Sequence, residues 1–473
     1  MKAFYPALGI ACLLSLPMTS HAETLEEIYE LALENDAQLK ADRNAYLAGK
    51  ESYKIARSGL MPTISANASL SKSSDESDGY RETPKGSAPS PIAGETDTDS
   101  TGWGASLVQP LFDMSIWYGF QRGKISNELA ETQFASAQQD FILRVAAAYF
   151  DVLRSIDTLE TSIAEERAIG SQLEQTKQRY EVGLTAITDV HETQAEYDRA
   201  TANTLQSRGN LGIAFEALEV LTGQPANAVA PIGDNFPVNN PEPANREEWV
   251  NFALENNYQL RSAKLAADSA KFSAKSAKSE HYPTVTGRIT YNNSSSESDF
   301  TNNGAVSLTS PASRYTDSDN ESTSVVISLD VPLFTGGRTS ASRRQAHYQY
   351  LQNLELFNNA KRNTIQSARS SHLLVETSVA TVRARQQAIV SSQSALEATQ
   401  AGYEVGTRTL VDLLLSQRAL YQSQRSYYDA LYSYIINTLR LKQAAGTLSP
   451  EDILELNRWL DAENQTTRAS YEN

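Results

Sequence analysis

"YEVGLTAITDV" begins at Tyr180 and "YEVGTRTLVDL" begins at Tyr403, and the two stretches share Tyr, Glu, Val, Gly and an Asp six residues after the Gly. They lie 223 residues apart. A second pair keeps almost the same separation, because "ALENDAQL" at Ala32 matches "ALENNYQL" at Ala253, 221 residues later. Near-constant offsets between distant pairs indicate that the chain contains two copies of one structural repeat.

Each repeat contains a long segment without proline, from Leu111 to Gln224 and from Leu333 to Ser449. Proline costs about 3 kcal/mol inside a helix, so these segments permit very long helices. Apolar residues in the first segment follow the 3-4 spacing of a coiled-coil seam, and a second seam runs beside it. Two adjacent seams predict a helix with neighbours on both sides, as in the wall of a helical barrel, although one wide core face of a globular bundle would give the same pattern. The first seam is Ile142, Val145, Tyr149, Val152, Ile156 and Leu159, and the second is Leu143, Ala146, Phe150 and Leu153.

The two quoted stretches lie at the far ends of these long helices. Phe112 to Gly183 spans 71 residues, which is about 105 Å of helix. A glycine lets the chain turn back after a helix, and Gly183 and Gly406 are placed to do so. We therefore expect a helical hairpin at about 114–222 and another at about 337–445.

Before each long helix, the pattern changes to strict alternation of apolar and small polar residues, as in "TISANASLSK" from Thr63. This pattern predicts strands that are apolar on one face, which suits the wall of a transmembrane barrel with a wet interior. Four strands cannot close a barrel, since a closed barrel needs about eight, so two or three copies of the chain must combine. The strands are expected at about 62–72, 102–112, 283–293 and 322–334, and the polar segments 73–101 and 293–322 are interpreted as surface loops.

The N-terminus has the layout of a secretory signal peptide. Lys2 precedes an apolar run from Ala7 to Leu16, and "TSHA" then offers a cleavage site after Ala22. We expect a signal peptide at 1–22, a first repeat at 23–243 that begins with a helix from about Glu23 to Leu60, a second repeat at 244–447, and a C-terminal segment at 448–473.

The cysteine, histidine and charge content argues against several classes of function. The only cysteine, Cys12, lies in the predicted signal peptide, so we expect no disulfide and no cysteine-based metal site. The histidines that follow are isolated, and no phosphate-binding loop or nucleophile elbow occurs. We therefore expect no enzymatic activity, no metal and no cofactor. The formal net charge of −16 makes nucleic acid a poor partner, because an acidic surface repels phosphates.

The quoted stretches, together with "QPLFDMSIW" and "AAGTLSPEDIL", resemble the TolC-type outer-membrane efflux proteins of Gram-negative bacteria over nearly the whole mature chain. This resemblance implies a homotrimer, with a 12-stranded outer-membrane β-barrel of four strands per protomer and a 12-helix periplasmic α-barrel. It also implies an equatorial region near Gly223–Pro243 and the C-terminal segment. Such channels export drugs, bile salts or proteins. The implied partners are outer-membrane lipid, a periplasmic adaptor (membrane fusion) protein and an inner-membrane RND, ABC or MFS transporter.

The resemblance also assigns residues to the periplasmic entrance, which is held closed by links between the two hairpins. These latch residues are Gln172, Thr188 and Asp189 on the first hairpin, with Tyr403 and Arg408 on the second. An acidic ring is implied at Asp412, whereas Leu415 stands where a second ring is expected, so that ring is missing. The implied adaptor-docking turns are Val182, Gly183, Leu184, Val405, Gly406 and Thr407.

Other interpretations stay open at this stage. Asp189 and Asp412 fit equally well as helix N-terminal residues stabilised by the helix dipole. Tyr403 fits as a packed coil residue, and Arg408 as a solvated charge. A dedicated protein-secretion outlet would carry the same features, because its specificity lies in its partners. A non-conducting periplasmic or surface coiled-coil scaffold would explain the seams, but not four alternating strands.

Overall fold

The computed structural model describes residues 23–81, 90–226, 228–233, 235–302, 313–461 and 466–467. The expected signal peptide at 1–22 lies outside the described residues. The chain divides into two compact units, which we describe separately. Unit 1 comprises Met1–Ala45, Thr132–Arg261 and Asn359–Asn473, and unit 2 comprises Tyr46–Glu131 and Ser262–Asn358.

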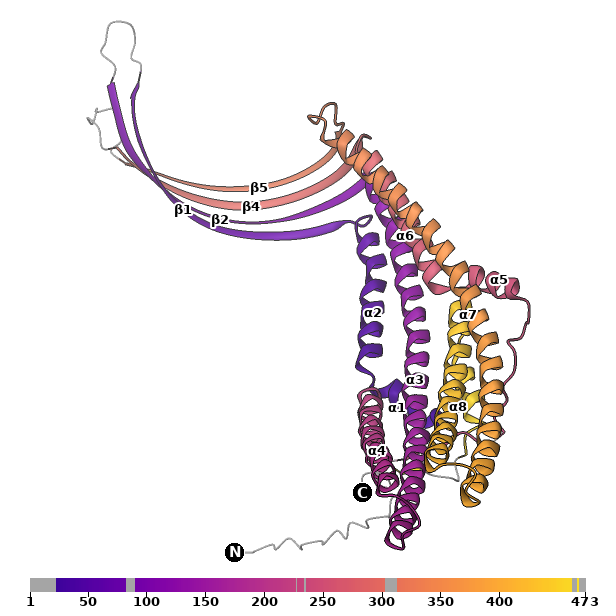
Figure 1. Cartoon of the computed structure of the whole chain (residues 1–473). Helices are drawn as coiled ribbons and strands as arrows, with labels where there is room; N and C mark the ends of the chain where they lie inside the picture. The colour runs from indigo at the N-terminus through magenta and orange to yellow at the C-terminus, as the bar shows by residue number, and fades with distance from the viewer. Residues whose placement is uncertain are drawn as a thin grey trace, which may run out of the picture. The chain divides into compact units, whose positions relative to one another are not determined.

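Unit 2 contains a four-stranded antiparallel sheet in the order β1-β2-β4-β5 (Figure 1). Its strands are β1 (Thr63–Arg81), β2 (Ser90–Phe112), β4 (Thr284–Asn302) and β5 (Ser313–Asp330). Strands β1 and β5 each pair with one neighbour, so within the described chain both edges of the sheet carry unpaired backbone groups. The sheet is therefore open at both sides.

The register of the sheet gathers apolar residues into rows across the four strands. Ile64 is opposite Leu107, Leu107 is opposite Ile289, and Ile289 is opposite Val325. Residues directly opposite in an antiparallel pair lie on the same face. The alternation that predicted the strands therefore places these side chains on one face, and Ile64 and Val325 remain 75% and 71% exposed in the protomer.

The strands are much longer than we expected from the sequence. β1 and β2 continue through most of the segment interpreted as a loop at 73–101, and β4 and β5 continue through most of 293–322. The reason is that backbone hydrogen bonds in a ladder do not require apolar side chains. Pairs such as Ser73↔Thr98 and Ser298↔Thr316 extend the ladder with polar residues, where apolar alternation no longer marks it.

Helices account for most of the remaining described chain. The seams predicted for the first long helix, α3 (Met114–Glu181), are buried in the core of unit 1. Leu143 alone among their ten residues is only partly buried. Because both seams enter one core, α3 presents a single wide buried face within this chain, as in the alternative of a globular bundle. The other helices are α1 (Leu25–Asn35), α2 (Ala37–Ser58), α4 (Ile187–Thr222), α5 (Arg246–Asn256), α6 (Tyr258–Ser279), α7 (Arg338–Glu404), α8 (Leu410–Ala445) and α9 (Pro450–Asn457).

The helix expected from about Glu23 to Leu60 is divided in two. Asp36 ends α1 and accepts a hydrogen bond from the backbone N–H of Leu39 in the first turn of α2. Asn257, at the corresponding place of the second expected repeat, ends α5 in the same way, and its side chain accepts from the backbone N–H of Leu260 in α6. Short polar side chains of this kind satisfy the free N–H groups of a new helix start, so a break costs little here.

A buried tyrosine of α3, Tyr149, holds the segment that follows α4 in place within unit 1. The hydroxyl of Tyr149 donates to the carbonyl of Ala230 at 2.9 Å and accepts from the Ala230 backbone N–H at 3.1 Å. Short strand β3 (Ala228–Val229) pairs beside it with β6 (Thr466–Thr467) of the C-terminal segment. These contacts bring together the two segments that the resemblance assigned to an equatorial region.

Two features are absent from the described residues. None of the helices there combines the length and apolarity needed to cross a membrane. In the same part of the chain, no group of three or more His, Cys, Asp or Glu side chains is placed to hold a metal ion.

Candidate functional site

The two helical hairpins of unit 1 end in turns of the same construction (Figure 1). Gly183 and Gly406 adopt φ values of +77° and +78°, which favour glycine. The turn backbones are closed by Leu184 N–H donating to the Arg179 carbonyl and by Thr407 N–H donating to the Gly402 carbonyl. These turns hold the six residues that the resemblance assigns to adaptor docking.

Apolar side chains project from both turns into solvent in the protomer. Val182 and Leu184 are each 69% exposed, and Val405 is 75% exposed. Neither turn contributes these side chains to a core cluster. Exposed apolar residues at the tip of a hairpin are suited to packing against another protein.

Asp412 lies in the first turn of α8 and caps that helix. The Thr409 hydroxyl accepts from the Asp412 backbone N–H, while the Asp412 carboxylate accepts from the Thr409 backbone N–H at 3.0 Å. These two bonds form a capping box. Hydrogen bonding from the Thr409 backbone N–H, and then from the Thr409 hydroxyl, holds the pKa of Asp412 below its ordinary value. The geometry thus gives Asp412 a structural role, and its carboxylate stays negatively charged.

Asp189 occupies the corresponding position of α4 with a different set of partners. Its carboxylate accepts a hydrogen bond from the hydroxyl of Thr185 in the preceding turn. The N-cap of α4 is Ala186, which has no side chain able to cap the helix. Thr188 is exposed beside it.

The structure does not bring the expected latch residues together within one protomer. The Tyr403 ring contacts Arg179, whose guanidinium carbon lies 5.2 Å from the ring centroid, in cation–π geometry. Arg408 is exposed in the turn before α8, and its stem lies against Gly402. No hydrogen bond among the described residues joins Tyr403 or Arg408 to Asp189. Arg179, which the sequence analysis did not single out, is thus the neighbour of Tyr403.

Gln172 is buried on α3, where its amide lies 3.5 Å from the Thr176 hydroxyl. It belongs to a polar continuation of the buried face of α3 beyond Leu159. There the helical spacing persists, and polar residues join the buried Ile169 and Leu173 on this face: Ser162, Glu165, Gln172 and Thr176 are all under 9% exposed. The helical spacing that continues here is a sequence signal for this face, which the two predicted seams did not include because they end at Leu153 and Leu159.

The most buried ion pair joins the two hairpins. Arg425 of α8 donates to a carboxylate oxygen of Glu165 at 2.7 Å, and the Glu165 side chain is only 1% exposed. The second Glu165 oxygen has no hydrogen-bond partner among the described residues. Removing one partner of so deeply buried an ion pair is costly, because the remaining charge then lacks its counter-ion in the protein interior.

A second polar contact between the hairpins links Asp157 of α3 to the hydroxyl of Tyr432 in α8. Burial raises the pKa of Asp157 to about 7, against a smaller lowering by the Tyr432 hydrogen bond. The folded protein therefore holds a proton between about pH 4 and pH 7 that the unfolded chain has released, so stability falls as pH rises across this window.

We expect Asp157→Asn to make the free energy of unfolding depend less on pH between about pH 4 and pH 7, and to raise it above pH 7. The slope attributable to Asp157 is at most about 1.4 kcal/mol per pH unit. Urea unfolding followed by helical circular dichroism at several pH values measures it. Asp151→Asn, an exposed change on the same helix, is the control. An Asp157→Asn profile parallel to that of the wild type would contradict the assignment.

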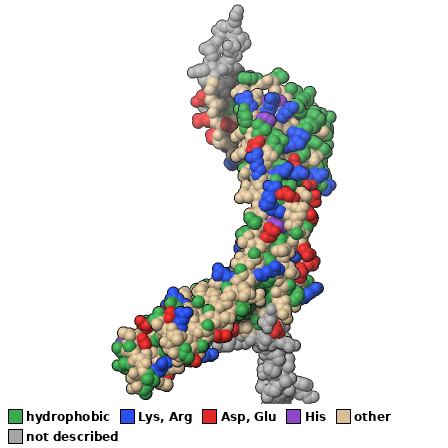
Figure 2. All heavy atoms as spheres, turned by 45° about the vertical axis from the view of Figure 1, so that its right-hand side comes forward, with side chains coloured by type: hydrophobic (Ala, Val, Ile, Leu, Met, Phe, Trp, Pro, Cys, Tyr) green, Lys and Arg blue, Asp and Glu red, His purple; other side chains and the backbone are tan. Residues whose placement is uncertain are grey.

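On the face shown in Figure 2, acidic and basic side chains are interspersed rather than gathered into one broad patch of either sign. This mixed surface offers no extended basic area to a nucleic acid backbone.

The comparisons with known proteins agree on one family. The family model described as "Outer membrane efflux protein" matches residues 28–224 and 249–447. The chain is 35% identical to outer membrane protein TolC of Vibrio cholerae serotype O1 over 462 residues, covering 97% of this chain and 99% of that protein. It is 30% identical to the alkaline protease secretion protein AprF of Pseudomonas aeruginosa over 445 residues, covering 94% and 88%. Among solved structures, the outer membrane protein VceC from Vibrio cholerae has a similar fold, with a TM-score of 0.69 at 18% identity over 89% of this chain and 96% of that one.

Proposed function

Because this chain belongs to the outer membrane efflux protein family, it is an outer-membrane channel that extends into the periplasm, and we propose that it works as a homotrimer. As an exit channel it serves efflux pumps or type I secretion systems. Channels of this family carry out no chemistry, and an inner-membrane partner supplies the energy.

The open sheet carries the trimer proposal. Its two unpaired edges cannot face lipid, since unpaired backbone groups cost several kcal/mol each in hydrocarbon. Its rows of exposed apolar residues suit a lipid-facing wall. Three copies would join edge to edge into a 12-stranded β-barrel, and their hairpins would form a 12-helix α-barrel. Two copies would give eight strands, so cross-linking and mass measurement of the detergent-solubilised protein distinguishes the two cases.

The exposed turns support a docking proposal. Val182, Leu184 and Val405 would pack against a periplasmic adaptor protein, together with the backbone of Gly183, Gly406 and Thr407. The adaptor would in turn connect the channel to an RND, ABC or MFS transporter. Drugs and bile salts are the expected solutes for a drug-efflux partner, and proteins for a secretion partner.

The entrance lies at the same turns in this proposal. Three copies of Asp412 would form the acidic ring, and Leu415 would leave the second ring position uncharged. The latch would form when Tyr403 and Arg408 leave their present neighbours and donate to Asp189, with Thr188 and Gln172 beside them. A charge-assisted hydrogen bond of this type contributes about 1.5–3 kcal/mol, so the latch would be breakable.

Ion conductance in a planar lipid bilayer tests the channel and its entrance together. We expect small, cation-preferring openings, and we expect Asp412→Asn to lower the cation-to-anion permeability ratio about twofold or more, because a ring of three charges is removed. Asparagine keeps an oxygen that can accept from Thr409, so the helix cap survives and the charge effect is isolated. Asp429→Asn, an exposed acid on the same helix, is the control.

The outcomes separate the two parts of the proposal. Intact oligomers without any conductance would overturn the channel in favour of a coiled-coil scaffold. Conductance that is unchanged in Asp412→Asn would leave the channel standing and refute the entrance assignment.

A dedicated protein-secretion outlet is the second candidate, favoured by the 30% identity to a protease secretion protein. Complementation decides between them. A strain that lacks its own exit channel and carries this gene would regain drug resistance in the first case, and only protein export in the second.

A further inference from the structure

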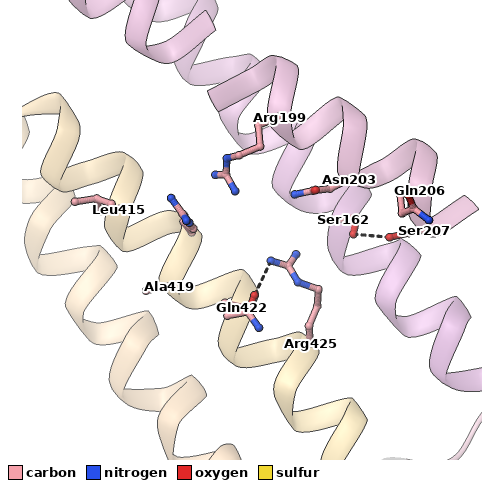
Figure 3. Close-up of a pocket in the computed structure, with 10 residues that line it drawn as sticks. Ser162, Arg199, Asn203, Gln206, Ser207, Leu415, Ala419, Gln422 and Arg425 are labelled. Atoms are coloured by element: carbon pink, nitrogen blue, oxygen red, sulfur yellow. Dashed lines mark hydrogen bonds between the residues drawn. The ribbon is translucent and has the colours of Figure 1, made fainter. Parts of the chain in front are cut away.

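A polar cavity of about 560 Å³ lies in unit 1 between the α3–α4 hairpin and α8 (Figure 3). Its volume falls within the range of about 300–1,000 Å³ that is usual for small-molecule sites. Three arginines line it, Arg199 from α4 and Arg418 and Arg425 from α8, and none of its lining residues is acidic. In a chain with a formal net charge of −16, a cavity of this composition is unexpected.

The three guanidinium groups differ in how far they are already engaged. Arg425 donates to the buried Glu165 and lies 3.4 Å from the Gln422 side chain. Arg199 pairs with Glu196 on its own helix. Figure 3 shows both side chains directed into the space between the helices. A guanidinium has five N–H donors, so each keeps donors for a further acceptor.

Arg418 differs from the other two because no hydrogen bond or ion pair engages it among the described residues. Its charge is therefore uncompensated at the wall of the cavity. Neutral donors complete the wall, since the amides of Asn203 and Gln206 and the hydroxyls of Ser162 and Ser207 line it as well. Leu415 and Ala419 add an apolar strip from α8.

The strip belongs to the same helix face as Asp412. At about 100° per residue, Leu415 and Ala419 lie within about 60° of Asp412 around the helix, whereas Arg418 is turned away from it by about 120°. Arg418 is six residues beyond Asp412, which is about 9 Å along the axis. A solute that passed an entrance at Asp412 would therefore reach the apolar strip first, with the unpaired Arg418 beside it in the wall of the cavity.

We propose that this cavity binds organic anions, solutes with carboxylate, sulfonate or phosphate groups on a small apolar body. The guanidinium forks of Arg418 and Arg199 match such groups in geometry, and Leu415 and Ala419 contact the apolar body. Its use in transport rests on the proposed channel function: the cavity would receive anionic solutes just inside the entrance and would offset the cation preference set by Asp412.

Calorimetric titration of the purified full-length protein with benzene-1,3-disulfonate tests binding. We expect saturable binding that weakens about tenfold or more in Arg418→Gln, because a charge-assisted hydrogen bond is lost. Arg418→Lys should restore part of the affinity. Arg385→Gln removes an equal charge from an exposed position on α7 and should leave affinity unchanged. The neutral analogue benzene-1,3-dimethanol should not bind.

Absence of saturable binding by the wild type would overturn the proposal, as would equal affinity in Arg418→Gln. Inorganic phosphate binding as tightly as the disulfonate would refute a site for organic anions.

Bilayer recordings distinguish the anion-site proposal from the channel proposal. We expect the disulfonate to block the wild-type current and Arg418→Gln to raise the cation-to-anion permeability ratio. A conducting channel that neither binds nor is blocked refutes the site alone, whereas binding without conductance refutes the channel alone.

Discussion

Arg425→Gln should lower the free energy of unfolding by about 3–5 kcal/mol, because it leaves a carboxylate without its partner in the protein interior. Glu165 is 1% exposed in its side chain, and its other oxygen already lacks a partner among the described residues. Urea unfolding followed by helical circular dichroism measures the change, read from the transition midpoint while the slope stays constant.

Two variants serve as controls for this prediction. Arg199 lines the same cavity, but its pair with Glu196 is partly exposed, at 34% and 28% of the side chains, so Arg199→Gln should cost under about 1 kcal/mol. Adding Glu165→Gln to Arg425→Gln should recover most of the loss, because the buried charge is then gone. If Arg425→Gln cost no more than Arg199→Gln, the buried pair would contribute nothing beyond an ordinary surface contact.

Gly446→Ala should destabilise the protein by about 3–5 kcal/mol, for two reasons that add. Gly446 caps α8 at a φ of +75°, where an L-residue is strained. A β-carbon there would also lie 2.4 Å from the carbonyl carbon and oxygen of Asn256, at the junction of α5 and α6. These are backbone atoms, which cannot rotate away as the end of a side chain can.

Gly406→Ala is the matched control for this second prediction. Gly406 has nearly the same φ, +78°, and a β-carbon at this position would meet no described atom within 4 Å. It should therefore cost only the strain, about 1–2 kcal/mol. Thermal and urea unfolding of both variants measure the difference. Equal losses would show that α5 and α6 move aside to admit the methyl group.

Local backbone chemistry explains which parts of the fold could be predicted from the sequence. Proline-free segments, seam residues and turn glycines determine local conformation within a few residues, so they can be recognised in the sequence. The burial of the α3 seams, which such spacing predicts, is confirmed. The strands were underestimated because apolar alternation marks only the part of a strand that needs an apolar face. Beyond Lys72 and before Ser322, the strands remain paired through polar residues, many of them serines and acidic residues. The backbone hydrogen bonds of these pairs do not require an apolar side chain, so the hydrophobic pattern of the sequence does not reveal them.

The contacts of the candidate site were less predictable, because they join residues far apart in the chain. Glu165 and Arg425 are 260 residues apart, and nothing in the sequence around either residue predicts that their side chains form an ion pair. The position of Arg179 over Tyr403 depends likewise on how the two hairpins pack. For Asp412 we expected, apart from the acidic ring, only a residue stabilised by the helix dipole, although Thr409, three residues before it, is a local signal for the capping box that the structure shows.

The difference between the two helix starts has a consequence for amino-acid substitutions. The second turn leads into α8 through the Thr409–Asp412 capping box, whereas α4 begins at Ala186 without a side-chain cap. Substitutions at Thr409 and Asp412 would forfeit about 0.5–2 kcal/mol of helix stability, a cost absent at Ala186. Amino-acid substitutions at the helix start are therefore tolerated more readily in the first turn than in the second.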